Sequence, residues 1–503
     1  MEYSAILHDM DKRFCYAIDK DLFVIRVQVK KDDIKEIILH YEDKYIPLEW
    51  KDTRKTIPMK KVATSQFHDY YEAQLQMHLI CLRYYFEFTD MQGEKVYYGN
   101  YEFSRECITN RDRMFDCPQN LREEEMFEVP EWAANKVVYQ IFPSRFAASQ
   151  PIDKELWYKA PITSKDNLHG DLRGIIDHLD HIQKLGIDVV YLTPIFKSDS
   201  CHKYDTTDYY QIDPSFGTTE DLKELVQKAH ECGMKVVMDA VFNHTGRDFF
   251  AFKDIQKNRE QSPYRDWYCN VNFYGNNEYN DGFSYDNWGG YNLLVKLNQR
   301  NPAVKDYICD VIRFWVSEFD IDGIRLDAAD VLDFDFMKAL RQTANEVKPE
   351  FWLMGEVIHG DYTRWVNEGT LHSVTNYQLH KALYSGHNDH NYFEIAHTVR
   401  RLYEMGGNRP DGLKLYNFVD NHDVERIYTK LQNKAQFFPV HVLLYTLPGI
   451  PSIYYGSEFG IEGKKERYSD DSLRPALQLA DYKNAATENP YTRLITALGK
   501  IRQ

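Results

Sequence analysis

The chain of 503 residues carries a formal net charge of -16, and 43% of its residues are hydrophobic, 27% charged and 15% aromatic. The acidic balance argues against a nucleic-acid partner, and the lack of an apolar run of about 18 residues argues against a membrane-spanning role. The length exceeds what one hydrophobic core fills, so two or three domains are expected.

The N-terminal segment MEYSAILHDMDKRF lacks the apolar centre of a signal peptide. The 8 cysteines are scattered, with no CxxC pair and no metal-ligand spacing. In a chain of this length such cysteines indicate free thiols rather than a disulfide framework. These features predict a cytoplasmic protein.

Residues 1 to about 125 alternate strand-like runs with turns. Runs such as DLFVIRVQV and LRYYFEFTD place apolar or aromatic residues at the period of a strand with one buried face. Because helical periodicity is scarce here, we expect an N-terminal antiparallel β-sandwich over residues 1–125. The charged stretch LREEEMFEVPEW (121–132) indicates a linker to a second domain spanning 126–503.

From Val137 onward, strand-like runs alternate with amphipathic helical stretches. About eight such units follow one another, which predicts an α/β fold, a (β/α)8 TIM barrel. Residues from about 244 to 298 are aromatic-rich and lack a helical period, so we expect an irregular insert after the third strand. Barrel enzymes place their active sites on this face.

Three carboxylates end three apolar strand-like runs: Asp327, Glu356 and Asp423. Arg325 lies two residues before Asp327 and therefore shares its face of the strand. Taken singly, Asp327 with Arg325 is as well explained by a structural ion pair, and Glu356 by a solvated strand end. A barrel gathers the C-terminal ends of its strands around one mouth, so the three together favour a catalytic site.

Glycoside hydrolysis needs two carboxyl groups beside the scissile bond, one ionised and one protonated. Arg325 would keep Asp327 ionised, as a nucleophile requires. Partial burial would raise the pKa of Glu356, as a general acid requires. Asp423 and the neighbouring His422 would form hydrogen bonds with the hydroxyl groups of the sugar ring.

Further side chains are expected around the same mouth. His202 and His244 are expected to contact substrate, whereas Asp239 is better explained as a support for Arg325. Tyr204 and Trp288 have two readings, as core aromatics or as stacking surfaces for sugar. Phe196, at a strand end, is equally explained by packing and by lining the site.

Four segments resemble the conserved regions of the α-amylase family of glycoside hydrolases (family 13): DAVFNH (239–244), GIRLDAADV (323–331), GEV (355–357) and FVDNHD (418–423). By position, Asp327 falls on the family's nucleophile, Glu356 on its acid/base and Asp423 on its transition-state stabiliser. Residues that match the subsite where the bond breaks are Tyr204, His244, Arg325 and His422. The resemblance implies a retaining double displacement.

Finer features resemble the branch of neopullulanases, cyclomaltodextrinases and maltogenic amylases: YQIFPSRF (139–146), YLTPIFKSDSCHKYDTTDYYQIDPSFG (191–217) and VKLN (295–298). This implies hydrolysis of α-1,4 bonds, with some α-1,6 cleavage, in cyclodextrins, maltooligosaccharides, pullulan or starch. It also implies a homodimer whose N-terminal domain narrows the partner's cleft. Two alternatives stay open, a mainly transglycosylating α-glucan enzyme and a non-catalytic carbohydrate-binding barrel protein.

Three departures from that branch bear on function. The branch has MPKLN where this chain has VKLN, and a VANE-like run where residues 328–331 read AADV, so the balance between hydrolysis and glycosyl transfer is open. The stretch FAASQPID (146–153) replaces an Asn/Asp-rich calcium loop, so no metal or other cofactor is expected there. The chain ends at ITALGKIRQ (495–503), where the eighth helix is expected, so we expect no C-terminal β-domain.

Overall fold

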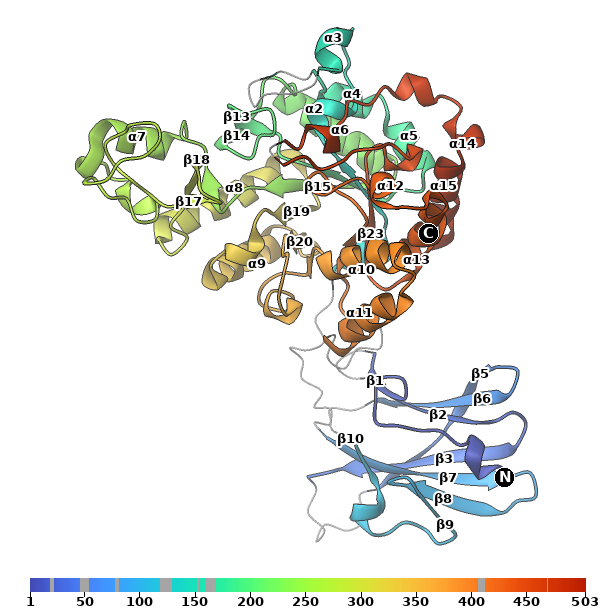
Figure 1. The fold of residues 1–503 in the computed structure, drawn as a ribbon. Coiled ribbons are helices and arrows are strands. Elements are labelled where there is room, and N and C mark those ends of the chain that lie inside the picture. The colour runs from blue at the N-terminus through green and yellow to red at the C-terminus, as the bar shows by residue number, and fades with distance from the viewer. Residues whose placement is uncertain are drawn as a thin grey trace. The chain divides into compact units, whose positions relative to one another are not determined.

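The computed structural model describes residues 1–18, 22–45, 54–76, 81–117, 129–151, 153–159, 166, 169–405, 412–467 and 469–503. The chain divides into two compact units, one formed by Met1–Phe127 with Leu402–Gly412 and one by Glu128–Arg401 with Leu413–Gln503. The first is drawn mainly in blue and the second mainly in green to red (Figure 1). Of the expected linker, residues 121–128 lie outside the described residues.

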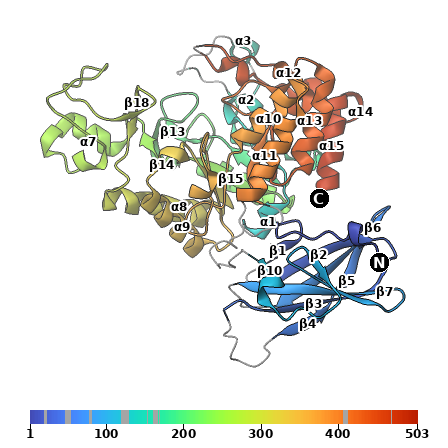
Figure 2. The same ribbon diagram turned by 60° about the horizontal axis from the view of Figure 1, so that its bottom comes forward.

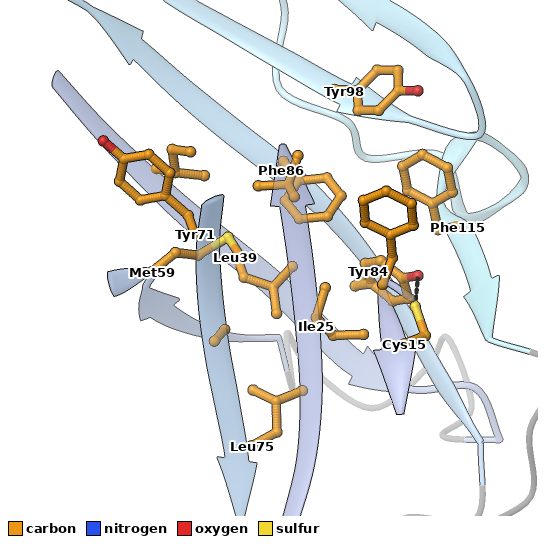
Figure 3. Close-up of a cluster of buried hydrophobic side chains, with 14 of the residues drawn as sticks. Cys15, Ile25, Leu39, Met59, Tyr71, Leu75, Tyr84, Phe86, Tyr98 and Phe115 are labelled. Carbon is orange, nitrogen blue, oxygen red and sulfur yellow. Dashed lines mark hydrogen bonds between the residues drawn. The ribbon is translucent and has the colours of Figure 1, made fainter. Parts of the chain in front are cut away.

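The first unit contains two antiparallel sheets, with strand orders β1-β2-β6-β5 and β4-β3-β7-β8-β9, and β10 beside β7. The strands are β1 (Cys15–Ala17), β2 (Leu22–Lys30), β3 (Ile34–Asp43), β4 (Lys55–Pro58), β5 (Lys60–Thr64), β6 (His68–Gln76), β7 (Leu82–Asp90), β8 (Lys95–Gly99), β9 (Glu102–Ser104) and β10 (Phe115–Cys117). Their apolar faces share one core, in which the Tyr84 hydroxyl lies 3.0 Å from the Cys15 Sγ (Figure 3). The expected β-sandwich is confirmed.

The second unit is built on eight parallel strands, ordered β21-β20-β19-β15-β12-β11-β23-β22 among the described residues. They are β11 (Val138–Ile141), β12 (Val189–Leu192), β15 (Lys235–Ala240), β19 (Gly323–Leu326), β20 (Trp352–Gly355), β21 (Ser373–Val374), β22 (Tyr416–Phe418) and β23 (Ile450–Tyr454). A parallel bridge between Thr375 and Tyr416 joins the two outermost strands. The sheet therefore closes, and the predicted barrel is confirmed.

Helices lie outside these strands in both views (Figures 1 and 2). The larger ones are α6 (Thr219–Glu231), α8 (Pro302–Phe319), α9 (Phe334–Val347), α10 (Tyr377–Asn388), α11 (Tyr392–Met405), α13 (Phe437–Thr446) and α15 (Pro490–Arg502), the last being the expected eighth helix. Shorter ones are α1 (Glu131–Ala134), α2 (Pro143–Phe146), α3 (Lys154–Trp157), α4 (Leu172–Ile176), α5 (Leu179–Lys184), α12 (Ile427–Lys430) and α14 (Ala485–Glu488). Within the described residues, none of the helices has the length and apolar character needed to cross a membrane.

One barrel unit departs from the expected alternation. Between β20 and β21 the chain forms only a 3-10 turn, Tyr362–Arg364, in place of an α-helix. The segment before β21 instead packs through Tyr362 and Trp365, which are both buried. The segment between β20 and β21 therefore lacks a helical period, because it is a loop that packs through buried aromatic side chains.

The insert after the third barrel strand is more regular than its sequence pattern predicts. It contains helix α7 (Phe250–Asn258) and a small sheet of β16 (His244–Thr245), β17 (Asn287–Trp288) and β18 (Tyr291–Lys296). Gly289 and Gly290 both have positive φ angles, 63° and 86°, which suits the tight turn between β17 and β18. A separate hairpin, β13 (Phe196–Ser198) and β14 (Thr206–Ile212), precedes α6.

Candidate active site

Arg325 lies at the centre of a buried cluster of carboxylates at the C-terminal ends of the strands. Its Nη1 is 2.9 Å from Asp239 Oδ1 and 2.8 Å from Asp327 Oδ1, and its Nη2 is 2.9 Å from Glu356 Oε2. The parallel pairing sets Asp239 on β15 opposite Arg325 on β19, and Glu356 follows the next strand, β20. The barrel thus brings together four of the side chains expected at its mouth.

The charges in this cluster do not balance, because three carboxylates surround one guanidinium. Burial raises the pKa of Asp327, Glu356 and Asp239, and the favourable charge of Arg325 opposes it. The cluster as a whole therefore holds a proton more tightly than an isolated carboxylate would. Arg325 lowers the pKa of Asp327, as expected, but burial has the larger effect, and the same cation also contacts Asp239 and Glu356.

The backbone after Asp327 takes part in this cluster. Ala328 has a left-handed conformation, with φ 46° and ψ 44°, which is uncommon for a residue other than glycine. Its N–H donates to Glu356 Oε2 at 3.1 Å. Strained backbone of this kind concentrates at functional sites, and here it links the residue after one carboxylate to the other carboxylate.

Asp423 follows β22 on another side of the mouth. Its Oδ2 lies 3.1 Å from His422 Nε2 and its Oδ1 lies 3.0 Å from Arg474 Nη2. Burial favours the neutral acid, but His422 and Arg474 outweigh it and lower the pKa of Asp423 to about 2. Asp423 is therefore ionised at neutral pH, and its side chain is 36% exposed and accessible to a ligand.

His422 and Tyr204 are held together by a chain of hydrogen bonds. Gln140 Nε2 lies 2.9 Å from His422 Nδ1, so Gln140 donates there and the histidine proton sits on Nε2, 2.6 Å from the Tyr204 hydroxyl. The Tyr204 hydroxyl donates in turn to Asp239 Oδ2 at 2.9 Å, and Tyr191 donates to the same oxygen at 2.7 Å. Burial lowers the pKa of His422 to about 3, so the ring is neutral.

His244 is fixed by a second chain of contacts that begins in the insert. Lys296 Nζ donates to Asn243 Oδ1 at 2.9 Å, and Asn243 Nδ2 lies 3.2 Å from His244 Nδ1. The other ring nitrogen, Nε2, donates to the Tyr204 carbonyl at 3.1 Å. Burial lowers the pKa of His244 to about 4. Trp288 lies beside it, with ring centroids 6.1 Å apart, and is 39% exposed.

Two expected site residues have different roles. His202 Nδ1 accepts from the Tyr204 backbone N–H at 3.1 Å, so His202 shapes the loop that carries Tyr204. Phe196 is only 2% exposed and stacks on Trp315 of α8 with ring centroids 4.4 Å apart. Of the two explanations left open for Phe196, these contacts favour core packing.

Sequence reasoning did not single out Gln140, Tyr191, Lys296 or Arg474 as site residues. Gln140 is a polar residue inside a fully buried strand, a signal that could have identified it. Lys296 belongs to the VKLN segment, which was assigned only to the shape of the cleft. Arg474 lies in the loop after β23, where no strand end or spacing pattern marks it.

The described residues at the start of the first barrel loop offer few oxygen ligands to a calcium ion. Ala147 and Ala148 offer no side-chain oxygen, and the Ser149 hydroxyl donates to Asp171 Oδ2 at 2.7 Å. The other oxygen of Asp171 accepts from the Gly174 N–H at 2.6 Å, at the start of α4. Asp171 is therefore occupied by the protein's own donors, and the described part of this loop does not bring together the six to eight oxygens that a calcium ion needs.

Comparisons with known proteins match both units to the same family of enzymes. The family model "Alpha amylase, catalytic domain" matches residues 140–492, and "Alpha amylase, N-terminal ig-like domain" matches residues 1–119. A cyclomaltodextrinase from Bacillus sp is 35% identical over 475 residues, covering 92% of this chain and 83% of that protein. An intracellular maltogenic amylase from Bacillus subtilis is 33% identical over 476 residues, covering 93% and 79%. A solved cyclomaltodextrinase structure has a TM-score of 0.73 at 32% identity, covering 100% of this chain and 85% of that one.

Proposed function

This chain belongs to the α-amylase family of glycoside hydrolases, and on that premise we propose that cyclodextrins and short maltooligosaccharides are its preferred substrates. It hydrolyses α-glucans, as its relatives do, at α-1,4 bonds. The preference for cyclodextrins is supported by the relatives in sequence and in structure that are named cyclomaltodextrinase. Pullulan and starch are the longer substrates to compare with them.

In the proposed mechanism Asp327 attacks the anomeric carbon while Glu356 donates its proton to the glycosidic oxygen. The glycosidic bond breaks and a glycosyl ester forms on Asp327. Glu356, now ionised, takes a proton from water as the water oxygen attacks the same carbon, and the ester bond breaks. Two displacements retain the anomeric configuration.

One observation carries this assignment: the Arg325 guanidinium bonds both Asp327 and Glu356 inside one buried cluster. The excess of negative charge there stabilises the positive charge that develops on the sugar in the transition state. Asp423, ionised and partly exposed, is placed to accept hydrogen bonds from ring hydroxyls. Tyr204, His244 and His422 would complete the wall of that subsite.

A mainly transglycosylating activity is the second candidate, and Trp288 favours it. This exposed ring beside His244 offers an apolar face on which an acceptor sugar can stack in competition with water. The third reading, a non-catalytic binding protein, is disfavoured because the three carboxylates and Arg325 form a connected, buried cluster.

We also propose that the protein acts inside the cell as a homodimer. The relative from Bacillus subtilis named as intracellular supports the location, and the branch resemblance supports the dimer. Analytical ultracentrifugation at micromolar concentration tests the second point, since a monomeric mass at all concentrations would exclude a stable dimer.

Chromatography of digests of β-cyclodextrin, maltotriose, pullulan and soluble starch, run beside Asp327→Asn, tests the function. We expect β-cyclodextrin and short oligomers to be converted to maltose and glucose faster than starch, and the variant to be inactive. Products longer than the substrate would favour the transglycosylase. Starch as the fastest substrate would point to an ordinary endo-amylase, and a folded but inactive wild type would overturn the catalytic assignment.

A further inference from the structure

A hollow of about 620 Å³ lies between the β13–β14 hairpin, the start of α7 and the helix α8. Ligand pockets typically measure about 300–1,000 Å³, so the volume suits a small ligand or part of a chain. No residue that lines it belongs to the carboxylate cluster around Arg325. The proposed mechanism leaves this hollow unused.

Strand β14 contributes to the lining of the hollow and also contacts the end of β15. Tyr209 is buried, and its hydroxyl donates to the backbone carbonyl of Val241 at 2.6 Å, beside the end of β15. Side chains of a strand alternate between its two faces, so Asp208 and Tyr210 lie on the face opposite Tyr209. Both of these line the hollow, as does Thr207, so β14 borders the hollow along several residues.

Aromatic rings form one wall of the hollow. Tyr307 of α8 lies with its ring centroid 5.8 Å from that of Tyr210 and 5.7 Å from that of Phe250. Phe250, the first residue of α7, is 44% exposed. A phenylalanine left this exposed on the wall of a concavity offers an apolar surface that the fold itself does not cover.

Charged side chains form the rest of the lining, and they nearly cancel. The carboxylates are Asp199, Asp208 and Asp248, and the ammonium groups are Lys197 and Lys253. A hydrogen bond to Asp248 raises the pKa of Asp199 to about 6, so the two acids share one proton in mildly acidic solution. Lys253 Nζ lies 2.9 Å from Asp248 Oδ1. The lining is then close to neutral, which favours neither an anion nor a cation.

A metal ion is disfavoured on geometry as well. Within the described part of the chain, no three His, Cys, Asp or Glu side chains converge as metal ligands. What remains is an apolar aromatic wall facing hydrogen-bonding groups of both signs. This combination suits a neutral polyhydroxylated ligand, whose C–H faces pack on rings and whose hydroxyl groups bond to carboxylates and ammonium groups.

We propose that this hollow is a second α-glucan binding site, which holds a distant segment of the polymer or a separate oligosaccharide. The proposal rests on the proposed function for the class of ligand. Since the hollow shares no lining residue with the carboxylate cluster, its occupation would raise the affinity for long chains and leave the chemistry on short ones unchanged.

Affinity electrophoresis in gels that contain soluble starch tests the site, with Phe250→Ala as the variant. Losing one aromatic contact should weaken retardation about three- to ten-fold, with kcat/KM on maltotriose unchanged. The matched control is Tyr274→Ala, because Tyr274 is fully exposed in the same insert and does not line the hollow. Lys253→Ala, at a side chain that is 59% exposed, carries the test if Phe250→Ala fails to fold.

Equal retardation of Phe250→Ala, Lys253→Ala and wild type would overturn the second site. A wild type that turns over maltotriose would in that case still support the proposed activity. Conversely, an inactive wild type whose retardation depends on Phe250 would refute the activity and support the site. The two proposals therefore fail in distinguishable ways.

Discussion

At the residue scale, the catalytic mouth is governed by the unequal numbers of carboxylates and cations around Arg325. Asp239, Asp327 and Glu356 share one guanidinium, whereas Asp423 lies between the His422 ring and Arg474, a cation whose other carboxylate contact is with Asp470. The pKa values consequently move apart, upward for Glu356 and downward to about 2 for Asp423. The raised pKa suits Glu356 as a proton donor, and the lowered pKa suits Asp423 as a group that stays ionised.

Glu356→Gln tests the acid role through the pH profile. Burial raises the pKa of Glu356, and only the protonated form donates, so kcat/KM of the wild type should fall as pH rises through that raised pKa. The variant should lose about 10²- to 10⁴-fold in kcat and should lack this alkaline limb. Glu368→Gln, at an exposed acid in the same loop, is the control. An alkaline limb retained in Glu356→Gln would assign the proton to another group.

Lys296→Met tests the chain of contacts that fixes His244. Without the donor to Asn243, the amide is free to turn and the tautomer of His244 is no longer enforced. One lost hydrogen bond from a charged donor predicts a loss of about ten-fold in kcat/KM, partly restored in Lys296→Arg. Lys257→Met, at an exposed lysine on α7, should match wild type. A loss that comes with a lower melting temperature would indicate a structural role instead.

At the element scale, the neighbouring barrel strands β19 and β20 pack closely at Gly323. Gly323 opens β19 between β15 and β20. A Cβ at this position would lie 2.5 Å from the Trp352 carbonyl oxygen and 3.0 Å from the Trp352 Cβ. The strand that carries Arg325 thus reaches its place because its first residue has no side chain.

Gly323→Ala should therefore destabilise the barrel by about 1–3 kcal/mol, the usual cost of overpacking. Gly369→Ala is the matched control, because its nearest neighbour would be the Asn367 Oδ1 at 3.6 Å. Urea unfolding followed by tryptophan fluorescence measures both. Equal stability of the two variants would show that β19 and β20 can separate enough to admit a methyl group.

Site residues at strand ends could be predicted from the sequence, whereas those that depend on loops or distant helices could not. Asp327, Glu356 and Asp423 were predictable because carboxylates that end apolar strands converge wherever parallel strands close a barrel. Arg474 was not, since its contact with Asp423 depends on the path of a loop. The sequence left Phe196 between two explanations because its packing partner, Trp315, comes from a helix far along the chain. The period and spacing of apolar residues predict helices and strands, whereas the contacts that loops make become known only from the structure.

At the scale of the whole molecule, the start of the barrel's first loop is held to α4 by hydrogen bonds within the chain. The Ser149–Asp171 contact closes that loop with the protein's own donors. Among the described residues, no three His, Cys, Asp or Glu side chains converge as metal ligands.

Removing divalent cations should consequently leave the protein unchanged. We expect the melting temperature in excess EDTA to agree with that in millimolar calcium, and the activity on maltotriose to be equal in both. Binding of a cation to the native state alone would instead raise the melting temperature as its concentration rises. Such a rise, reversed by EDTA, would contradict the interpretation of the first loop.

The shared guanidinium of Arg325 has a consequence for inhibition. A cluster with more carboxylates than cations favours a positively charged guest over a neutral one, although the natural substrate is uncharged. A sugar mimic with a basic nitrogen near the anomeric position would meet that charge directly. Its affinity would increase as the pH rises and the cluster loses its proton, until the nitrogen itself becomes neutral.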